Sequence, residues 1–115
     1  MALKVYRQGD VAFIPVNDVA LERRIARAKA RSRIIRRGEN GGVHTLTGIK
    51  AKVVTVNTTP WMNSRGRMYL HTPKGAQVVH REHRTVTLPA GNYEVRVQRE
   101  LQGSGQQRRA RRVMD

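Results

Sequence analysis

The clearest structural signal in the chain is the segment Arg84-Thr85-Val86-Thr87-Leu88-Pro89-Ala90-Gly91-Asn92-Tyr93-Glu94-Val95-Arg96-Val97. It contains two runs of β-branched and aromatic residues joined by a short connection with Pro and Gly, a pattern typical of a β-hairpin. We therefore predict that residues 84–88 and 93–97 are two strands that pair with each other.

Working outward from this segment, similar short runs recur along the chain, separated by turns rich in Gly, Pro and Asn. They cover residues 3–7, 11–16, 33–37, 43–46, 50–56, 68–71 and 76–80. Short strands at regular intervals indicate a mainly β fold, which we predict to be a small antiparallel β-barrel or sandwich.

One segment has the period of a helix instead. Asn17 and Asp18 are good N-cap residues, and Leu21, Ile25 and Ala28 follow at spacings that place them on one face. We predict a short basic helix over about residues 18–30, inserted in the β fold. Its arginines occupy the remaining arc, so packing or a polyanion must offset their mutual repulsion.

Length and composition set the domain organisation. A chain of 115 residues and 13.1 kDa supports one compact core. From residue 101 a Gln-Gly-Ser-Gly-Gln-Gln stretch is typical of a linker, and a basic end follows it. We predict one β domain over residues 1–100 and a basic tail over residues 101–115.

The charge is the strongest functional signal. The chain has 23 Lys and Arg against 8 Asp and Glu, a net charge of +15. Most of the basic residues are arginines, whose guanidinium groups bind phosphate bidentately and stack on bases. A polyanion relieves the self-repulsion of such a chain and releases counterions on binding. Part of the arginine bias can also reflect a GC-rich genome.

These observations predict a non-enzymatic protein that binds the phosphate backbone of nucleic acid, with structured RNA slightly favoured over DNA. The expected contacts are Arg23, Arg24, Arg27, Arg31, Arg33, Arg36, Arg37, Arg65, Arg67, Arg108, Arg109, Arg111 and Arg112, with Trp61 as a stacking platform or, equally, a lid on the core. Membrane binding is not expected, because the basic stretches lack aromatic residues and no apolar run is long enough to span a bilayer.

The catalytic and metal signals are weak. There is no cysteine, and no arrangement of Ser, His and Asp or of paired carboxylates stands out. We expect no enzymatic activity and no cofactor. His44, His80 and His83 are weak candidates for metal ligands, and the favoured interpretation is that they hydrogen-bond across a loop or contact phosphate. A metal-dependent enzyme lined by these histidines stays a second alternative.

Several elements together resemble a family of small uncharacterised bacterial and phage proteins. They are Tyr6-Arg7-Gln8-Gly9-Asp10-Val11, Gly38-Glu39 with Gly42, His80-Arg81-Glu82-His83, Leu88-Pro89-Ala90-Gly91-Asn92-Tyr93-Glu94-Val95-Arg96 and Gln98-Arg99-Glu100. The resemblance covers most of the chain except residues 17–32 and 57–67. It implies an all-β fold, a strand at residues 33–37 and a histidine-lined site, and it brings no activity.

This chain departs from the family pattern at two places. Gly42-Val43-His44-Thr45 stands where the family carries Gly-His-x-His, and Arg81 replaces an acidic residue in the second histidine element. Both departures weaken a metal site. The main rival to free nucleic-acid binding is a structural or accessory protein of a phage or virus-like particle, oligomeric and with basic arms that contact the genome or acidic neighbours. For either role we expect a cytoplasmic location, or a particle assembled in the cytoplasm.

Overall fold

The computed structural model describes residues 4–37, 42–57 and 66–97. Within these ranges the chain forms nine strands and one helix, in agreement with the predicted mainly β fold. In chain order they are β1 (Tyr6–Gln8), β2 (Val11–Pro15), α1 (Val19–Arg27), β3 (Ile34–Arg37), β4 (Val43–Thr47), β5 (Lys52–Val56), β6 (Arg67–Thr72), β7 (Ala76–His80), β8 (His83–Leu88) and β9 (Gly91–Val97). The predicted tail at residues 101–115 lies outside the described ranges.

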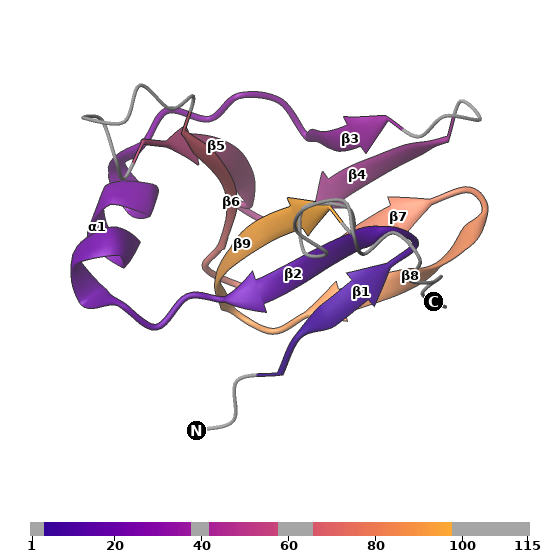
Figure 1. Ribbon diagram of the computed structural model, residues 1–115, viewed down its shortest axis with the longest axis horizontal. Coiled ribbons are helices and arrows are strands. Elements are labelled where there is room, and N and C mark those ends of the chain that lie inside the picture. Colours follow the sequence, from indigo (N-terminus) through magenta and orange to yellow (C-terminus); the bar gives the residue numbers. More distant parts are fainter. Residues whose placement is uncertain (1–3, 38–41, 58–65, 98–115) are drawn as a thin grey trace, which may run out of the picture.

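The strands make two antiparallel sheets that pack face to face as a sandwich (Figure 1). Sheet A has the order β1-β2-β9-β6-β5, and sheet B has the order β3-β4-β7-β8. The sheets are not joined into a closed barrel, so of the two predicted architectures the sandwich is the one observed. Along one side of the sandwich, β1 of sheet A packs beside β8 of sheet B.

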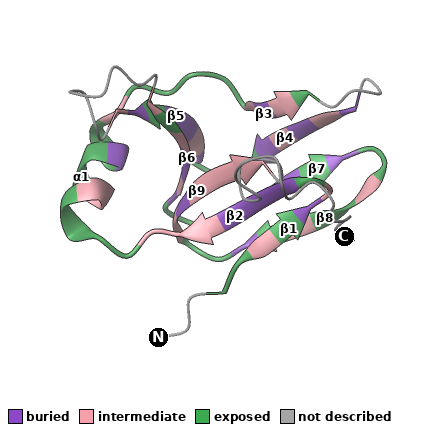
Figure 2. Cartoon of the chain, viewed as in Figure 1, coloured by how far each residue is buried: buried purple, intermediate pink, exposed green. Residues whose placement is uncertain are grey.

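The main core lies between the two sheets and follows from the alternation of the strands. In β7, for example, Ala76, Val78 and His80 are buried while the residues between them are exposed. The buried apolar residues of this core are Val11, Phe13, Ile35, Leu46, Ala51, Val53, Leu70, Ala76, Val78, Leu88 and Tyr93. Figure 2 shows buried segments on strands of both sheets.

A second, smaller core lies on the outer face of sheet A, under α1. Ile25 of the helix is fully buried against Val54, Val56 and Tyr69 of β5 and β6. Leu21 and Ala28 pack on the same cluster, as their predicted spacing requires. Sheet A is therefore covered by sheet B on one face and by α1 on the other, with β5 and β6 lying between the two cores.

The helix is shorter than predicted. It spans Val19–Arg27 instead of residues 18–30, with Asp18 as its N-cap and Ala28 already in an extended conformation. The chain leaves the helix there because the Arg31 amide donates to the carbonyl oxygen of Val53, 2.8 Å away, which draws the following segment along β5. In the described residues no helix is long or apolar enough to cross a membrane.

The predicted hairpin at residues 84–97 is wrong. Both strands exist, but β8 pairs with β7 in sheet B whereas β9 pairs with β2 and β6 in sheet A. The connection between them crosses from one sheet to the other, because Leu88 and Tyr93 are both buried in the core between the sheets. The hydroxyls of Thr72 and Tyr93 donate to the Pro89 carbonyl oxygen and fix this crossing.

Candidate functional site

The helix presents its basic side chains away from the sheet. The Asp18 carboxylate accepts hydrogen bonds from the amides of Ala20 (3.0 Å) and Leu21 (3.2 Å), which fixes the start of the helix. Because Ile25 faces the sheet, the opposite arc carries exposed arginines. These are Arg23, Arg24 and Arg27, and Figure 2 shows most of α1 as exposed.

The contacts of these arginines differ. Arg24 Nη2 donates to the Asn57 carbonyl oxygen at 2.8 Å, and Arg31 Nη1 donates to Thr55 Oγ1 at 2.9 Å. The side chains of Arg23 and Arg27 make no hydrogen bond or ion pair in the part of the chain that the structure describes. Two guanidinium groups of the helix are therefore presented to solvent with their donors available to a ligand.

A lysine closes the other end of the helix. Lys52 Nζ donates to the carbonyl oxygens of Ala26 and Ala28, each at 2.7 Å. A cation at this place is favourable because carbonyl groups at a helix C-terminus lack intrahelical partners and carry partial negative charge. Lys52 thus holds the helix to β5.

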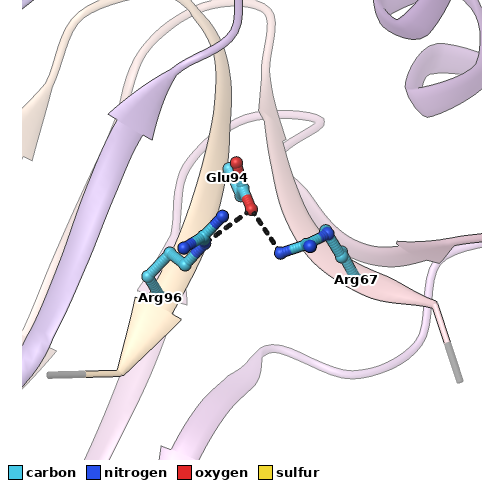
Figure 3. Close-up of polar contacts among 3 residues, drawn as sticks. All are labelled: Arg67, Glu94 and Arg96. Carbon is cyan, nitrogen blue, oxygen red and sulfur yellow. Dashed lines mark hydrogen bonds and ion pairs between the residues drawn. The ribbon is translucent and has the colours of Figure 1, made fainter. Parts of the chain in front are cut away.

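Next to the helix, two arginines share one carboxylate on the outer face of sheet A. Glu94 Oε2 accepts from Arg67 Nη1 at 3.1 Å and from Arg96 Nε at 2.8 Å (Figure 3). The register pairs Tyr69 of β6 with Glu94 of β9, so Arg67 and Arg96 both lie beyond this pair on the same face. The Arg67 side chain is 52% exposed and the Glu94 side chain 20%, so the two guanidinium groups reach outward from a better-covered carboxylate.

Tyr69 contacts both regions, because it packs in one cluster with Ile25 of the helix and is the cross-strand partner of Glu94. Burial and then the Glu94 carboxylate raise the pKa of Tyr69, and the charges of Arg67, Arg96 and Arg24 oppose that rise. The three arginines come from β6, β9 and α1, which are far apart in the sequence. We give the name basic face to the arginines carried by α1 and by the outer face of sheet A, which are Arg23, Arg24, Arg27, Arg67 and Arg96.

The remaining predicted contacts lie elsewhere. Arg33 donates to the carbonyl oxygens of Leu46 (3.0 Å) and Gly48 (3.4 Å), which holds the connection between β4 and β5. Arg36 is partly buried, and Arg37 is exposed at the end of β3. The predicted residues Trp61, Arg65, Arg108, Arg109, Arg111 and Arg112 lie outside the described ranges.

Sequence reasoning did not include Arg96 or Glu94 in the site. The signal was present, because Glu94 and Arg96 alternate on one face of a strand and Arg67 opens the neighbouring strand. What was missing was the pairing of β6 with β9, since the two segments are more than 20 residues apart and the sequence names no partner for either.

The histidines predicted as weak metal candidates come together at one end of the sandwich. The ring centroids of His44 and His80 are 4.4 Å apart, those of His80 and His83 4.5 Å, and those of His44 and His83 6.0 Å. His44 lies on β4, whereas His80 and His83 form the turn between β7 and β8. We call these three residues the histidine cluster.

Gln8 fixes the protonation of His44. Its Nε2 donates to the carbonyl oxygens of Val78 (2.9 Å) and Arg84 (2.8 Å), so its Oε1 is the atom that faces His44 Nδ1 at 2.8 Å. An amide oxygen can only accept, so His44 carries a proton on Nδ1. In the neutral ring the lone pair is then on Nε2.

Burial and, next in size, the neighbouring His80 lower the pKa of His44 to about 4. His83 and Arg36 also disfavour the charged ring, whereas Asp10 favours it. Arg36 Nη2 lies 3.6 Å from Asp10 Oδ2, and the buried Arg36 Nε has no hydrogen-bond partner. At neutral pH the His44 ring is therefore uncharged.

The cluster is a set of packed rings. No group of three or more His, Cys, Asp or Glu side chains within residues 4–37, 42–57 and 66–97 is placed to hold a metal ion. His80 Nδ1 accepts from the Glu82 amide at 3.0 Å and His44 Nδ1 donates to Gln8, so both of these ring nitrogens are already engaged.

A groove of about 340 Å³ lies at the opposite end of the sandwich. It is lined by Thr47, Gly48, Ile49, Lys74, Gly75, Ala76, Gln77, Thr87 and Leu88. Lys74 is the one ionisable side chain in this lining, and Thr47, Gln77 and Thr87 are its other polar side chains.

Comparison with known proteins gives a family without an activity. No curated protein and no solved structure matches the chain significantly. Residues 7–98 match the domain of unknown function DUF8820, and this range contains every described strand except the first residue of β1. The predicted resemblance to an uncharacterised family is thereby confirmed. The chain belongs to the DUF8820 family.

Proposed function

We propose that this chain is a non-enzymatic nucleic-acid-binding protein whose basic face contacts the phosphate backbone. The observation that supports it best is the pairing of Arg67 and Arg96, from two strands distant in the sequence, with the single carboxylate of Glu94. Two guanidinium groups against one carboxylate leave an excess of positive charge on the outer face of sheet A.

The Glu94 carboxylate prepares this surface for phosphate. It holds Arg67 and Arg96 by the same oxygen atom, so both side chains have already lost much of their rotamer freedom before a ligand arrives. An anion that binds to side chains ordered in advance loses less free energy to ordering. Arg23 and Arg27 extend the same surface along α1 with donors available to further phosphates.

Structured RNA is the favoured partner in this proposal, ahead of duplex DNA. A rigid face of arginines recognises the shape and charge of a folded backbone and offers no fixed pattern of base contacts. The proposed location is the cytoplasm or a particle assembled there. Stacking by Trp61 and contacts by the C-terminal arginines stay predictions on residues outside the described ranges.

The test is the salt dependence of binding to a labelled RNA hairpin and to a DNA duplex. Each phosphate contact contributes about −0.7 to −0.9 to the slope of log affinity against log salt. The double variant Arg23→Ala/Arg27→Ala should therefore flatten the slope by about 1.4 to 1.8 if each arginine contacts one phosphate. Its thermal midpoint should stay close to that of the wild type, because both side chains are exposed.

A matched control removes the same charge elsewhere. Lys74→Ala/Arg84→Ala takes two exposed cations from the side of sheet B and should change the slope much less. Equal effects of the two double variants would show that net charge alone drives binding and that there is no basic face. Absence of binding to both RNA and DNA at low salt would refute the proposed function itself.

A further inference from the structure

The histidine cluster joins parts of the chain that are distant in sequence. Gln8 at the end of β1 bonds to His44 of β4, to the Val78 carbonyl of β7 and to the Arg84 carbonyl of β8. Gln8 belongs to sheet A and its three partners belong to sheet B. These bonds therefore hold the two sheets together along the side where β1 packs beside β8, which we call the seam.

The hydrogen bond made by His80 requires a neutral ring, whereas the bond from His44 Nδ1 to Gln8 is kept in either charge state. His80 Nδ1 accepts from the Glu82 amide at 3.0 Å, a bond that closes the turn between β7 and β8. A proton on that nitrogen turns the acceptor into a donor and sets it against another donor, so the turn loses its bond. For His44 a second proton goes to Nε2, on a ring whose centroid is 4.4 Å from that of His80.

The charges that face the cluster do not compensate for such protons. Asp10, from the β1–β2 turn, is the carboxylate that favours a charged His44, and it is 3.6 Å from Arg36 of β3. In the β7–β8 turn the Glu82 carboxylate lies 4.0 Å from Arg81, and both side chains are more than half exposed. Both of these carboxylates, which belong to the described residues, thus already face an arginine, and the low pKa of His44 agrees with this balance.

The rings also have little room to move apart within the closed seam. A Cβ atom on Gly42 would lie 2.5 Å from His80 Nε2, and one on Gly9 would lie 2.7 Å from His83 Nε2. Two rings are thus packed directly against glycine backbone. Charged rings can separate only if one of the turns that carry them moves.

We propose that the histidine cluster is an acid-sensitive latch, which holds the β7–β8 turn against β1 and releases it when His44 and His80 take up protons. Release opens the seam locally and leaves the inner strands of both sheets paired. The latch stands on the bonds and ring contacts of the cluster alone, and it does not depend on whether the basic face binds nucleic acid.

The experiment is amide hydrogen exchange of the full chain between pH 7.5 and 4.5, corrected for the intrinsic pH dependence of exchange. The opening constant for amides of β1 and of the β7–β8 turn should rise as the pH falls, by up to tenfold per pH unit for each proton taken up. Amides of β2, β9 and β6 should stay better protected than the seam amides throughout this range. A uniform loss of protection across all strands would overturn the latch in favour of global acid unfolding.

The variants His80→Asn and His44→Asn separate the latch from general charge effects. Asn at position 80 offers an oxygen to the Glu82 amide, and Asn at position 44 offers an N–H to Gln8, but neither side chain titrates in this range. Each variant should reduce the pH dependence of seam opening. His71→Asn is the control, because His71 contacts Asn92 on the outer face of sheet A, and its profile should match the wild type.

A second measurement keeps the latch testable if a variant does not fold. The ring resonances of the wild-type histidines, followed by NMR, should show His44 and His80 neutral while the seam amides are protected. Charged His44 or His80 rings beside a fully protected seam would overturn the proposal. So would seam opening in His80→Asn with the pH dependence of the wild type.

Discussion

Replacing Ile25 with Ala tests how α1 is held and whether its docking matters for binding. Ile25 is fully buried and is the one α1 residue classed as buried, so it carries most of the contact with Val54, Val56 and Tyr69. The change removes three carbon atoms, which at about 0.8 kcal/mol each gives about 2.4 kcal/mol of lost transfer free energy. A cavity left under the helix raises the expected cost to about 3 kcal/mol.

The assay is urea unfolding followed by circular dichroism, with hydrogen exchange of the amides in residues 19–27. Ile25→Val is the graded control and should cost about 1 kcal/mol, because it removes a single carbon. RNA affinity should fall in Ile25→Ala although no charge has changed, since the arginines of α1 are then no longer held against the outer face of sheet A. A cost below about 0.5 kcal/mol, or normal protection of the helix amides, would refute the reasoning that Ile25 docks the helix.

Three further predictions concern the cap, the pH dependence and the glycines. Asp18→Ala should lower stability by about 1 kcal/mol, seen in the thermal midpoint, because two helix amides lose their acceptor; an unchanged midpoint would contradict the cap. The unfolded chain binds a proton at His44 below about pH 6.5 and the folded chain only near pH 4, so stability should fall as the pH drops through that window, by at most about 3 kcal/mol from this group. Urea unfolding at several pH values, with His44→Asn for comparison, checks this, and equal slopes in both proteins would count against it. Gly42→Ala should lower the midpoint more than Ala90→Gly, a change at an exposed loop residue, because its Cβ would lie 2.5 Å from His80 Nε2; equal effects would show that the rings adapt.

Alternation in the sequence was enough to locate the strands, because each of them has one face in the core. Pairing was harder, as the segment at residues 84–97 shows. A Pro-Ala-Gly-Asn connection indicates that the chain turns, but it does not say whether the two strands end in one sheet or in two. That choice depends on Leu88 and Tyr93 entering one core from opposite sides, which is a property of the assembled sandwich.

Some residues of the candidate site could likewise be predicted from the sequence, whereas others could not. The exposed arginines of α1 could be predicted from the helical period and the N-cap. These local signals located the helix correctly, except that its predicted last turn is not helical. The Arg67–Glu94–Arg96 contact needs the register between β6 and β9, which no local pattern supplies. The histidine cluster could be predicted only in part. Burial of His80 follows from the alternation that it continues after Ala76 and Val78, but its contact with His44 depends on the pairing of β4 with β7.

The order of strands in sheet A has a consequence for synthesis of the chain. Its central strand, β9, is the last to be made, and it joins β1 and β2 to β6 and β5. While the ribosome is still producing residues 16–90, the N-terminal hairpin has no neighbour within its sheet and its free edge stays available to other chains. Sheet A can therefore be completed only late in synthesis, when Gly91–Val97 has left the ribosome and pairs with β2 and β6.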